Sequence, residues 1–527
     1  IVRNLIAVQR DDGWIDARPG LDGQRANVLA PPLLATLAYT VYEYTQRDGF
    51  LRDTFDGLLA FFRRWLQPDL DQDGDGLPEW SRPEQGAFGD SPTLARSRRW
   101  AQGANINTIE APDLAAYLLR EAASLIQIAQ VLGDQGVADE VALRRDALRE
   151  HLQAMWNPET GAFHYRDRDT DAVPLGEIIF EGKGDQPLRD RTPLPHASRL
   201  ILRVIGGMSH KPRVGCTIEG VNGNGQPTHE TLDANAFDWY RGMGSATTRT
   251  VWREITDLKF DGLSRVYTVQ VSTVDLSRHD QSLFVPLWTD AVTPEQVEQM
   301  VAMLTDPARY GREYGIPACP ANDPAYDPTQ QNGCGAVWPR WTTLIAWGLL
   351  DHGYRREAAM LFERLLNAQI RSLTTEQVFR ALYNPDTGEG LGDSDVLEGV
   401  VSLGWFARLF GAFVPRSGCV MITGPLAFEG QPMVWTQHGI RIERSPDSTA
   451  IRFASGHSVT LPPDAGAQLI CDEQPAAAEP PPLARTDPAD PGTPNVEPES
   501  ALPVDDAEPD DEQPALPPYD GLLPDVD

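Results

Sequence analysis

The chain has 527 residues, of which 41% are apolar and 23% are charged, so it can form two or three folded domains with at least one large core. Its formal net charge of −31 disfavours binding to nucleic acid through the phosphates. The sequence holds no run of 18 apolar residues and therefore predicts no membrane span.

The first residues, Ile1 to Val8, read as a helix already under way, and they contain no methionine, charged leader or cleavage site. We expect the natural start to be processed or cropped, so a signal peptide would not be visible. Residues 1–192 form the first part of a helical domain, in which apolar side chains recur with helical spacing. Pro112 near the start and Gly133 past the end bound one of these segments. The expected helices cover residues 31–47, 50–66, 112–132 and 137–155.

The hydrophobic pattern changes to that of strands near Pro193. The Asn-Gly-Asn-Gly run at residues 222–225 is typical of a hairpin turn between two strands. We expect residues 193–277 to be a β-sandwich-like module inserted into the helical domain. The expected strands cover residues 199–205, 214–220 and 267–271.

Residues 278–413 return to helical spacing and form the second part of the helical domain. The segment from Pro339 onward is apolar nearly all round, as a buried helix would be. In residues 414–472 the period falls to two, which predicts a small C-terminal β module. The expected helices cover residues 294–304, 339–350, 355–370 and 395–411.

Residues 473–527 form an acidic tail that is rich in proline. From residue 472 to the end there are sixteen acidic residues and one basic residue, Arg485. With few large apolar groups, such a segment cannot bury enough surface to offset its chain entropy. We expect a disordered or extended tail.

Pairs of helices joined by short turns, on both sides of a β insertion, are typical of an α/α toroid. We count nine or ten expected helices. The sequence thus predicts a mainly α fold: a toroid of helical hairpins with an inserted β module and a small C-terminal β module.

The five cysteines are too few for a disulfide framework. Cys319 and Cys334 bracket a loop, and Cys419 and Cys471 bracket the C-terminal β module, which leaves Cys216 over. Two disulfides and a set of buried thiols are both compatible with this spacing. The acidic tail favours a location outside the cytoplasm or at the cell surface over a cytoplasmic one.

An acidic segment from residue 71 to residue 79 has the D-x-D-x-D-G form of a calcium-binding loop. Alternate oxygen ligands in such a loop can converge on one hard cation. The twelfth position is Arg82 rather than Glu, so the loop is not an EF-hand. We expect a structural Ca²⁺ site, with a solvated acidic turn as the alternative. The ligands that this pattern predicts are Asp71, Asp73, Asp75, Leu77 through its carbonyl, and Glu79.

Two further segments suggest sugar chemistry. Trp338 precedes Pro339 at the start of a buried helix, where an indole can stack on a sugar face. The turn-rich loop around Tyr383 is compatible in isolation with any connection between helices. For each tryptophan, ordinary core packing is the alternative. The segments are Gly335-Ala336-Val337-Trp338-Pro339 and Phe379-Arg380-Ala381-Leu382-Tyr383-Asn384-Pro385-Asp386-Thr387-Gly388-Glu389-Gly390.

Together with the acidic loop, these segments resemble the six-hairpin glycosidases, in particular processing α-glucosidases, trehalases and the hydrolases of mannosylglycerate and glucosylglycerate. The resemblance covers residues 1–192 and 278–411, with the motifs in the same order. It implies an (α/α)6 barrel of twelve helices, whose first hairpin would lie upstream of Ile1 or come from another chain. It also implies inverting hydrolysis of an α-glycosidic bond. Further motifs that carry the resemblance are Gln9-Arg10-Asp11-Asp12-Gly13-Trp14, Pro31-Pro32-Leu33-Leu34-Ala35, Gly76-Leu77-Pro78-Glu79-Trp80, Glu110-Ala111-Pro112-Asp113-Leu114, Phe284-Val285-Pro286-Leu287 and Tyr314-Gly315-Ile316-Pro317.

The sequence departs from the family where the catalytic pair should stand. The resemblance places the general acid at Gly89, within the run Gly-Ala-Phe-Gly-Asp-Ser-Pro that starts at Gly86. It places the general base at Ala381, two residues before Tyr383. Loss of either member of such a pair normally lowers the rate by orders of magnitude.

The resemblance and the departures from it are compatible with two alternative functions. In the first, the protein is an inverting hydrolase of α-glucosides or α-mannosides, in which Asp90 protonates the leaving oxygen and Glu389 activates water. In the second, the scaffold binds carbohydrate or assembles with other chains without catalysis, because a displaced carboxyl group is a poor replacement. The other carboxylates considered as base are Glu376 and Asp393. The side chains expected to contact sugar are Trp80, Trp338 and Tyr383.

Overall fold

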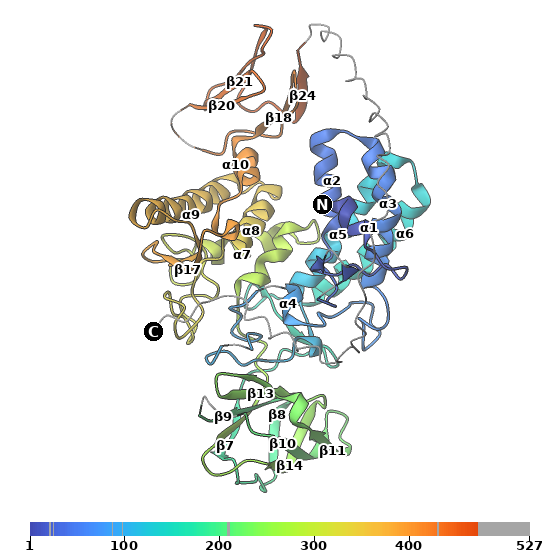
Figure 1. The fold of residues 1–527 in the computed structure, drawn as a ribbon, viewed down its shortest axis with the longest axis vertical. Helices are drawn as coiled ribbons and strands as arrows, with labels where there is room; N and C mark the ends of the chain where they lie inside the picture. The colour runs from blue at the N-terminus through green and yellow to red at the C-terminus, as the bar shows by residue number, and fades with distance from the viewer. Residues whose placement is uncertain are drawn as a thin grey trace, which may run out of the picture.

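The computed structural model describes residues 1–472, apart from residues 21, 22, 25, 87, 97, 208–210, 429 and 431. The tail at residues 473–527, expected to be disordered or extended, lies outside the described residues. Figure 1 shows a central helical part with a β module at each end of the molecule.

The first half of the helical part follows the expected segments closely. Helix α5 begins with Pro112 at its first turn and ends at Gly133, whose φ of 79° gives the left-handed C-cap that glycine adopts without strain. It packs against α2, α3 and α6, so nearly all of its faces are buried. The helices are α1 (Val2–Ala7), α2 (Leu34–Thr45), α3 (Asp48–Trp65), α4 (Pro83–Gly86), η1 (Ile106–Thr108), α5 (Pro112–Leu132) and α6 (Gln135–Ala154).

The second half of the helical part shares one hydrophobic core with the first. This core runs from Val2 to Leu409 and joins α5 to the 3-10 helix η3 and to α8. Helices α2 and α3, α5 and α6, and α8 and α9 pair as consecutive hairpins. The remaining helices are η3 (Gln281–Trp288), α7 (Pro294–Thr305), α8 (Pro339–Asp351), α9 (Arg355–Thr375), η4 (Leu397–Gly399) and α10 (Leu403–Phe410).

The expected helix over residues 395–411 is only partly correct. The chain first leaves strand β17, then makes the 3-10 turn η4, and becomes helical only at Leu403. Gly399 explains the break, because a Cβ at this position would lie 1.7 Å from the Arg380 carbonyl oxygen. The missing side chain lets Gly399 pack directly against β16. Strands β16 (Arg380–Tyr383) and β17 (Gly390–Ser394) form a hairpin.

Short two-residue strands connect the helices of the first half. They pair as β1 with β2, β3 with β6 and β4 with β5. Strand β3 leads directly into the start of α5. The bounds are β1 (Pro19–Gly20), β2 (Gly23–Gln24), β3 (Ile109–Glu110), β4 (Trp156–Asn157), β5 (Ala162–Phe163) and β6 (Arg166–Asp167).

The inserted β module consists of two antiparallel sheets with strand orders β11-β10-β14-β8 and β12-β13-β9-β15-β7. Its buried residues form a second core, which includes Leu202, Ile218 and Trp252. Strand β7 lies before Pro193, so strands begin earlier than the hydrophobic pattern suggested. The elements are β7 (Ile178–Lys183), β8 (Thr192–Ser198), β9 (Leu200–Ile205), β10 (Gly215–Asn222), β11 (Pro227–Leu232), η2 (Ala234–Ala236), β12 (Asp238–Tyr240), β13 (Met243–Thr247), β14 (Trp252–Asp261) and β15 (Thr268–Thr273).

The C-terminal β module has its own small core, built on alternating buried residues such as Ile440 and Ile442 of β21. Its strands form sheets β18-β19-β24 and β20-β21-β22-β23. With two β modules, the fold is mixed α and β rather than mainly α. The strands are β18 (Ala412–Arg416), β19 (Cys419–Ile422), β20 (Met433–Gln437), β21 (Ile440–Arg444), β22 (Thr449–Arg452), β23 (Ser458–Leu461) and β24 (Gln468–Cys471).

The structure decides between the two cysteine interpretations in favour of disulfides. Cys319 is bonded to Cys334, and Cys419 is bonded to Cys471 across β19 and β24. Cys216 is a buried free thiol on β10. Within the described part of the chain, none of the helices is long and apolar enough to cross a membrane.

Candidate functional site

Asp90 lies in the loop after α4, and its side chain is fully enclosed. One carboxylate oxygen accepts hydrogen bonds from the Gln330 amide and from Trp338 Nε1, the latter at 3.2 Å. The other oxygen lies 3.2 Å from the Arg98 guanidinium. Burial raises the pKa of Asp90, while Arg98 and the two hydrogen bonds act in the opposite direction. Asp90 is therefore a desolvated carboxyl group that three neighbours hold in place.

Trp338 is the centre of an aromatic group beside Asp90. It caps the start of α8 and is 5% exposed. Phe88 meets the Trp338 and Trp341 rings edge to face, with centroids 5.7 Å and 5.2 Å away. The Arg340 guanidinium lies over the Trp338 ring, 5.4 Å from its centroid. The expected sugar platform is thus an indole whose polar edge is bound to Asp90.

Of the two positions that the family resemblance assigns to the acid and the base, Gly89 lies against Trp338. A Cβ at Gly89 would lie 3.4 Å from the Trp338 ring, in ordinary van der Waals contact. Ala381 is buried on β16, and the backbone of β16 pairs with Val337 through hydrogen bonds to Tyr383 of 2.8 and 3.2 Å. The fold therefore joins the strand that carries Ala381 to the residue before Trp338, and neither Gly89 nor Ala381 carries a carboxyl group.

The carboxylates considered as a replacement base do not gather around Asp90 in the same way. Glu389 is exposed in the turn between β16 and β17. Glu376 is bound by the Arg380 guanidinium at 2.6 Å. Asp393 is half-buried on β17. None of these side chains has a contact with Asp90 among the described interactions.

Tyr383 and Trp80 occupy core positions rather than a surface that a sugar could reach. The Tyr383 hydroxyl donates to the Gly399 carbonyl at 3.1 Å, and the side chain is fully buried. Trp80 is 1% exposed, donates from Nε1 to Asp113 at 3.3 Å and lies edge-on to Trp65. Both residues stabilise the walls of the site from behind.

Sequence reasoning missed two buried carboxyl groups in the same region. Asp113 lies in the first turn of α5, and burial, reinforced by the negative charge of Asp280, raises its pKa to about 7. Asp280 is fully buried and accepts from the Tyr165 hydroxyl at 3.1 Å and from the Ser282 amide and hydroxyl. Asp113 stands in the quoted Glu-Ala-Pro-Asp-Leu motif, which was the available signal.

The carboxylates of the acidic loop fall into two groups of three that share Asp73. Oxygens of Asp71, Asp73 and Glu79 lie within 4.8 Å of one another, as do those of Asp73, Asp75 and Glu110. Glu110 comes from β3 and was not part of the predicted ligand set. It stands at the start of the quoted Glu-Ala-Pro-Asp-Leu motif, some thirty residues beyond the acidic segment, so the calcium pattern itself does not include it.

Glu79 and Glu110 are the buried members of this cluster. They are 2% and 1% exposed, and Oε1 of each accepts no hydrogen bond. Burial raises the pKa of Glu79 to about 8 and, together with the neighbouring Asp75 charge, that of Glu110 to about 9. Two buried carboxylate oxygens without donors beside three aspartates fit a hard divalent cation. Leu77 contributes an amide that donates to Asp75 at 2.8 Å.

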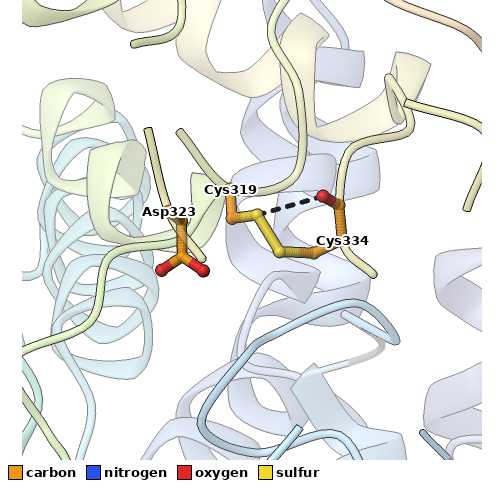
Figure 2. A group of neighbouring side chains, drawn as sticks. All are labelled: Cys319, Asp323 and Cys334. Carbon is orange, nitrogen blue, oxygen red and sulfur yellow. Dashed lines mark hydrogen bonds between the residues drawn. A yellow bond between two sulfur atoms is a disulfide. The ribbon is translucent and has the colours of Figure 1, made fainter. Parts of the chain in front are cut away.

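A second group of potential metal ligands has another explanation. Cys319, Cys334 and Asp323 lie close together, as Figure 2 shows. The two sulfur atoms form a disulfide and offer no thiolate to a metal. Asp323 accepts hydrogen bonds from the Arg278 guanidinium. This group closes and fixes the loop before α8.

Comparison with known families agrees with this arrangement. The sequence model of the "Mannosylglycerate hydrolase MGH1-like glycoside hydrolase domain" family matches residues 2–197 and 234–396. The chain belongs to this family. The match confirms the resemblance to six-hairpin glycosidases. Residues 198–233 of the inserted β module are not covered by the family model. No curated protein matches the chain.

Solved structures that match the chain include two of the GH63 mannosylglycerate hydrolase from Thermus thermophilus. The complex with glucose is 16% identical over 77% of this chain and 85% of that chain, with a TM-score of 0.47. The complex with Tris and D-glycerate is 16% identical over 77% and 86%, with the same TM-score of 0.47. A protein described as a sialidase is 12% identical over 83% of this chain and 33% of that chain, also at 0.47. Family membership rests on the sequence model.

Proposed function

We propose that this glycoside hydrolase domain binds α-linked glucosides or mannosides beside Trp338 and has lost the acid–base pair of an inverting hydrolase. The observation that supports this most directly is the state of Asp90. Its exposure is 0%. Oδ2 accepts hydrogen bonds from Gln330 and Trp338, and Oδ1, which accepts no hydrogen bond, is ion-paired with Arg98. A general acid must come within hydrogen-bond distance of the leaving oxygen. An enclosed carboxyl group cannot reach the substrate in this way.

The position of the general base also supports the loss of the acid–base pair. An inverting glycosidase needs a second carboxyl group roughly 6.5–9.5 Å from the acid, with a water between them. Ala381 provides none, and Glu389 is exposed to solvent in a hairpin turn. Membership of a glycoside hydrolase family supports sugar binding.

Hydrolysis is the second candidate, because one property of Asp90 favours it. Burial raises the pKa of this carboxyl group, and a raised pKa is what a general acid requires at neutral pH. In this case Asp90 donates the proton and Glu389 activates the water. The reaction inverts the configuration of an α-glucoside or α-mannoside.

The deciding experiment measures binding and hydrolysis on the same preparations. Methyl α-glucoside and methyl α-mannoside serve as ligands, and the 4-nitrophenyl α-glycosides serve as substrates. We expect saturable binding that Trp338→Phe weakens roughly three- to tenfold, with no hydrolysis above background. Trp435→Phe, in the C-terminal module, is the matched control and should bind as the wild type does.

Two further variants separate the candidates. Asp90→Asn should leave any residual rate unchanged, whereas the double substitution Gly89→Asp with Ala381→Glu should gain hydrolysis of about 10²-fold over background. A wild-type rate that falls by that factor in Asp90→Asn would establish the second candidate instead. Absence of binding to both glycosides would contradict both.

The acidic loop is assigned a structural Ca²⁺. Asp71, Asp73, Asp75 and Glu79 supply carboxylate oxygens, and Leu77 supplies its carbonyl, as the sequence pattern predicted. Glu110 adds a buried carboxylate from β3, so the ion would link the loop to the segment that leads into α5. The cation offsets the charge of buried oxygens, and no catalytic role is assigned to it.

The proposal also includes the closure of the helical part and the cellular location of the protein. The paired helices close as an (α/α)6 toroid. The boundaries between the helical parts, the two β modules and the tail lie near residues 192, 277, 413 and 472. The protein works outside the cytoplasm or at the cell surface, and its two disulfides support this because such bonds persist in oxidising compartments.

A further inference from the structure

A polar cavity lies where the helical part meets the inserted β module. Its volume is about 250 Å³, and its walls come from the loop after α4, from β13 and from neighbouring segments. Four arginines line it, Arg96, Arg168, Arg199 and Arg249, against one carboxylate, Asp238. In a chain with a net charge of −31, this concentration of guanidinium groups is unusual.

Three of the four arginines already have carboxylate partners. Arg96 lies 2.8 Å from Asp238, and Arg168 lies 2.7 Å from Asp169. Arg199 is fully buried and is bound by Asp167 at 2.7 Å and by Asp169. These ion pairs hold the walls of the cavity in place. Because each of these guanidinium groups is neutralised by a carboxylate, the three pairs add little net positive charge to the cavity.

Arg249 is the exception. Its guanidinium is exposed and has no ion pair or hydrogen bond with any of the described residues. Its backbone, by contrast, is anchored on both sides: the amide donates to Glu230 at 2.8 Å, and the carbonyl accepts from the Arg199 guanidinium. A fixed backbone carries an unpaired cation at this cavity.

Further hydrogen-bond donors face the same space. Arg96 Nε is buried and has no acceptor. The Asn105 carbonyl oxygen accepts from Arg96 at 2.9 Å and from the Asn107 amide at 3.4 Å, so its NH₂ group is the part left for a ligand. Among the described residues that line the cavity none is aromatic, so it lacks the flat apolar surface on which sugar rings stack.

We infer that this cavity binds a small oxyanion, a carboxylate or a phosphate, between Arg249 and the donors of Arg96 and Asn105. The planar fork of a guanidinium matches the oxygens of either group and forms charge-assisted hydrogen bonds with them. The site is separate from Asp90 and Trp338, which do not line the cavity. It does not depend on the proposed sugar-binding function.

Calorimetric titration of the full chain tests this site. Inorganic phosphate and acetate are titrated separately, with chloride at matched ionic strength and glycerol as a neutral ligand. We expect saturable binding of at least one oxyanion to the wild type, and none of chloride or glycerol. Arg249→Gln should weaken that binding at least tenfold.

The matched control is Arg253→Gln, which removes the same charge from an exposed position on β14 that does not line the cavity. It should bind the oxyanion within twofold of the wild type. Arg249→Lys keeps the charge but not the fork, so it should retain phosphate better than acetate. Thermal unfolding checks that each variant is folded. Lack of saturable binding in the wild type, or equal affinity of Arg249→Gln and Arg253→Gln, would overturn the inference.

Discussion

At the scale of single residues, the resemblance assigns the general acid to Gly89 and matches Asp90 only with the neighbour of that acid. The carboxyl group stands at Asp90, where it is enclosed by Arg98, Gln330 and Trp338, and the preceding, less buried position is Gly89. Adjacent residues in a loop point in different directions. The Asp90 carboxyl group is therefore part of the core, and the exposed position beside it carries no carboxyl group.

Asp113 gives a residue-scale prediction about pH. Its pKa is about 7 in the folded protein against an ordinary value of 3.8, so between these values the folded state holds a proton that the unfolded chain has released. The resulting stabilisation is complete below about pH 4 and is lost as the pH rises to about 7. We expect Asp113→Asn, which stays neutral and keeps an acceptor for Trp80, to lose stability less steeply.

The measurement is the free energy of unfolding in urea between pH 5 and pH 7.5. The difference in slope from the wild type should approach, and not exceed, about 1.4 kcal/mol per pH unit, the value for one proton. Asp447→Asn, at an exposed position of the C-terminal module, should follow the wild-type curve. Parallel curves for Asp113→Asn and the wild type would show that Asp113 is ionised throughout.

At the scale of elements, the acidic loop and strand β3 depend on each other. The loop supplies three aspartates and Glu79, while β3 supplies Glu110 from the residue pair that precedes α5. Without a cation, a buried oxygen of each glutamate has no hydrogen-bond partner. A bound ion would therefore stabilise the loop and the start of α5 together.

Removal of calcium tests this connection. Chelation by EGTA should lower the Tm, and added Ca²⁺ should restore it; at a hundred times the Kd the stabilisation is about 2.7 kcal/mol. Glu110→Gln should abolish the response as completely as Glu79→Gln does. Glu150→Gln, an exposed position on α6, is the control and should respond like the wild type. A Tm that chelation does not change would remove the metal from the proposal.

At the scale of the whole molecule, three separate cores and two disulfides stabilise different parts of the structure. One core extends through both halves of the helical part, and each β module has its own. The disulfide Cys319–Cys334 closes the loop that precedes α8, while Cys419–Cys471 joins strands β19 and β24 of the C-terminal module. The helical part and the C-terminal module each carry one such bond.

Thiol titration provides the prediction at this scale. The unfolded chain should show one reactive thiol, Cys216, without reductant and five after reduction. Reduction of the 15-residue connection between Cys319 and Cys334 should cost about 3 kcal/mol of stability. Cys216→Ser is the control and should show no thiol before reduction. Three or more thiols in the unreduced protein would contradict the pairing.

The sequence by itself determined the helical segments with strong periodicity, the change to strands in both β modules with three of the strands of the inserted module, the acidic loop and the family. These features depend on spacing within one segment, which hydrophobic period, caps and turn residues record directly. It also placed the loss of both family carboxylates, at Gly89 and Ala381.

Only the tertiary structure decided what distant segments do to one another. It added Glu110 to the acidic loop, enclosed Asp90, placed Tyr383 and Trp80 in the core and broke the expected helix over residues 395–411 at Gly399. It also joined the arginines of four segments around one cavity. Burial and charge pairing depend on neighbours that are far apart along the chain, and no local pattern carries that information.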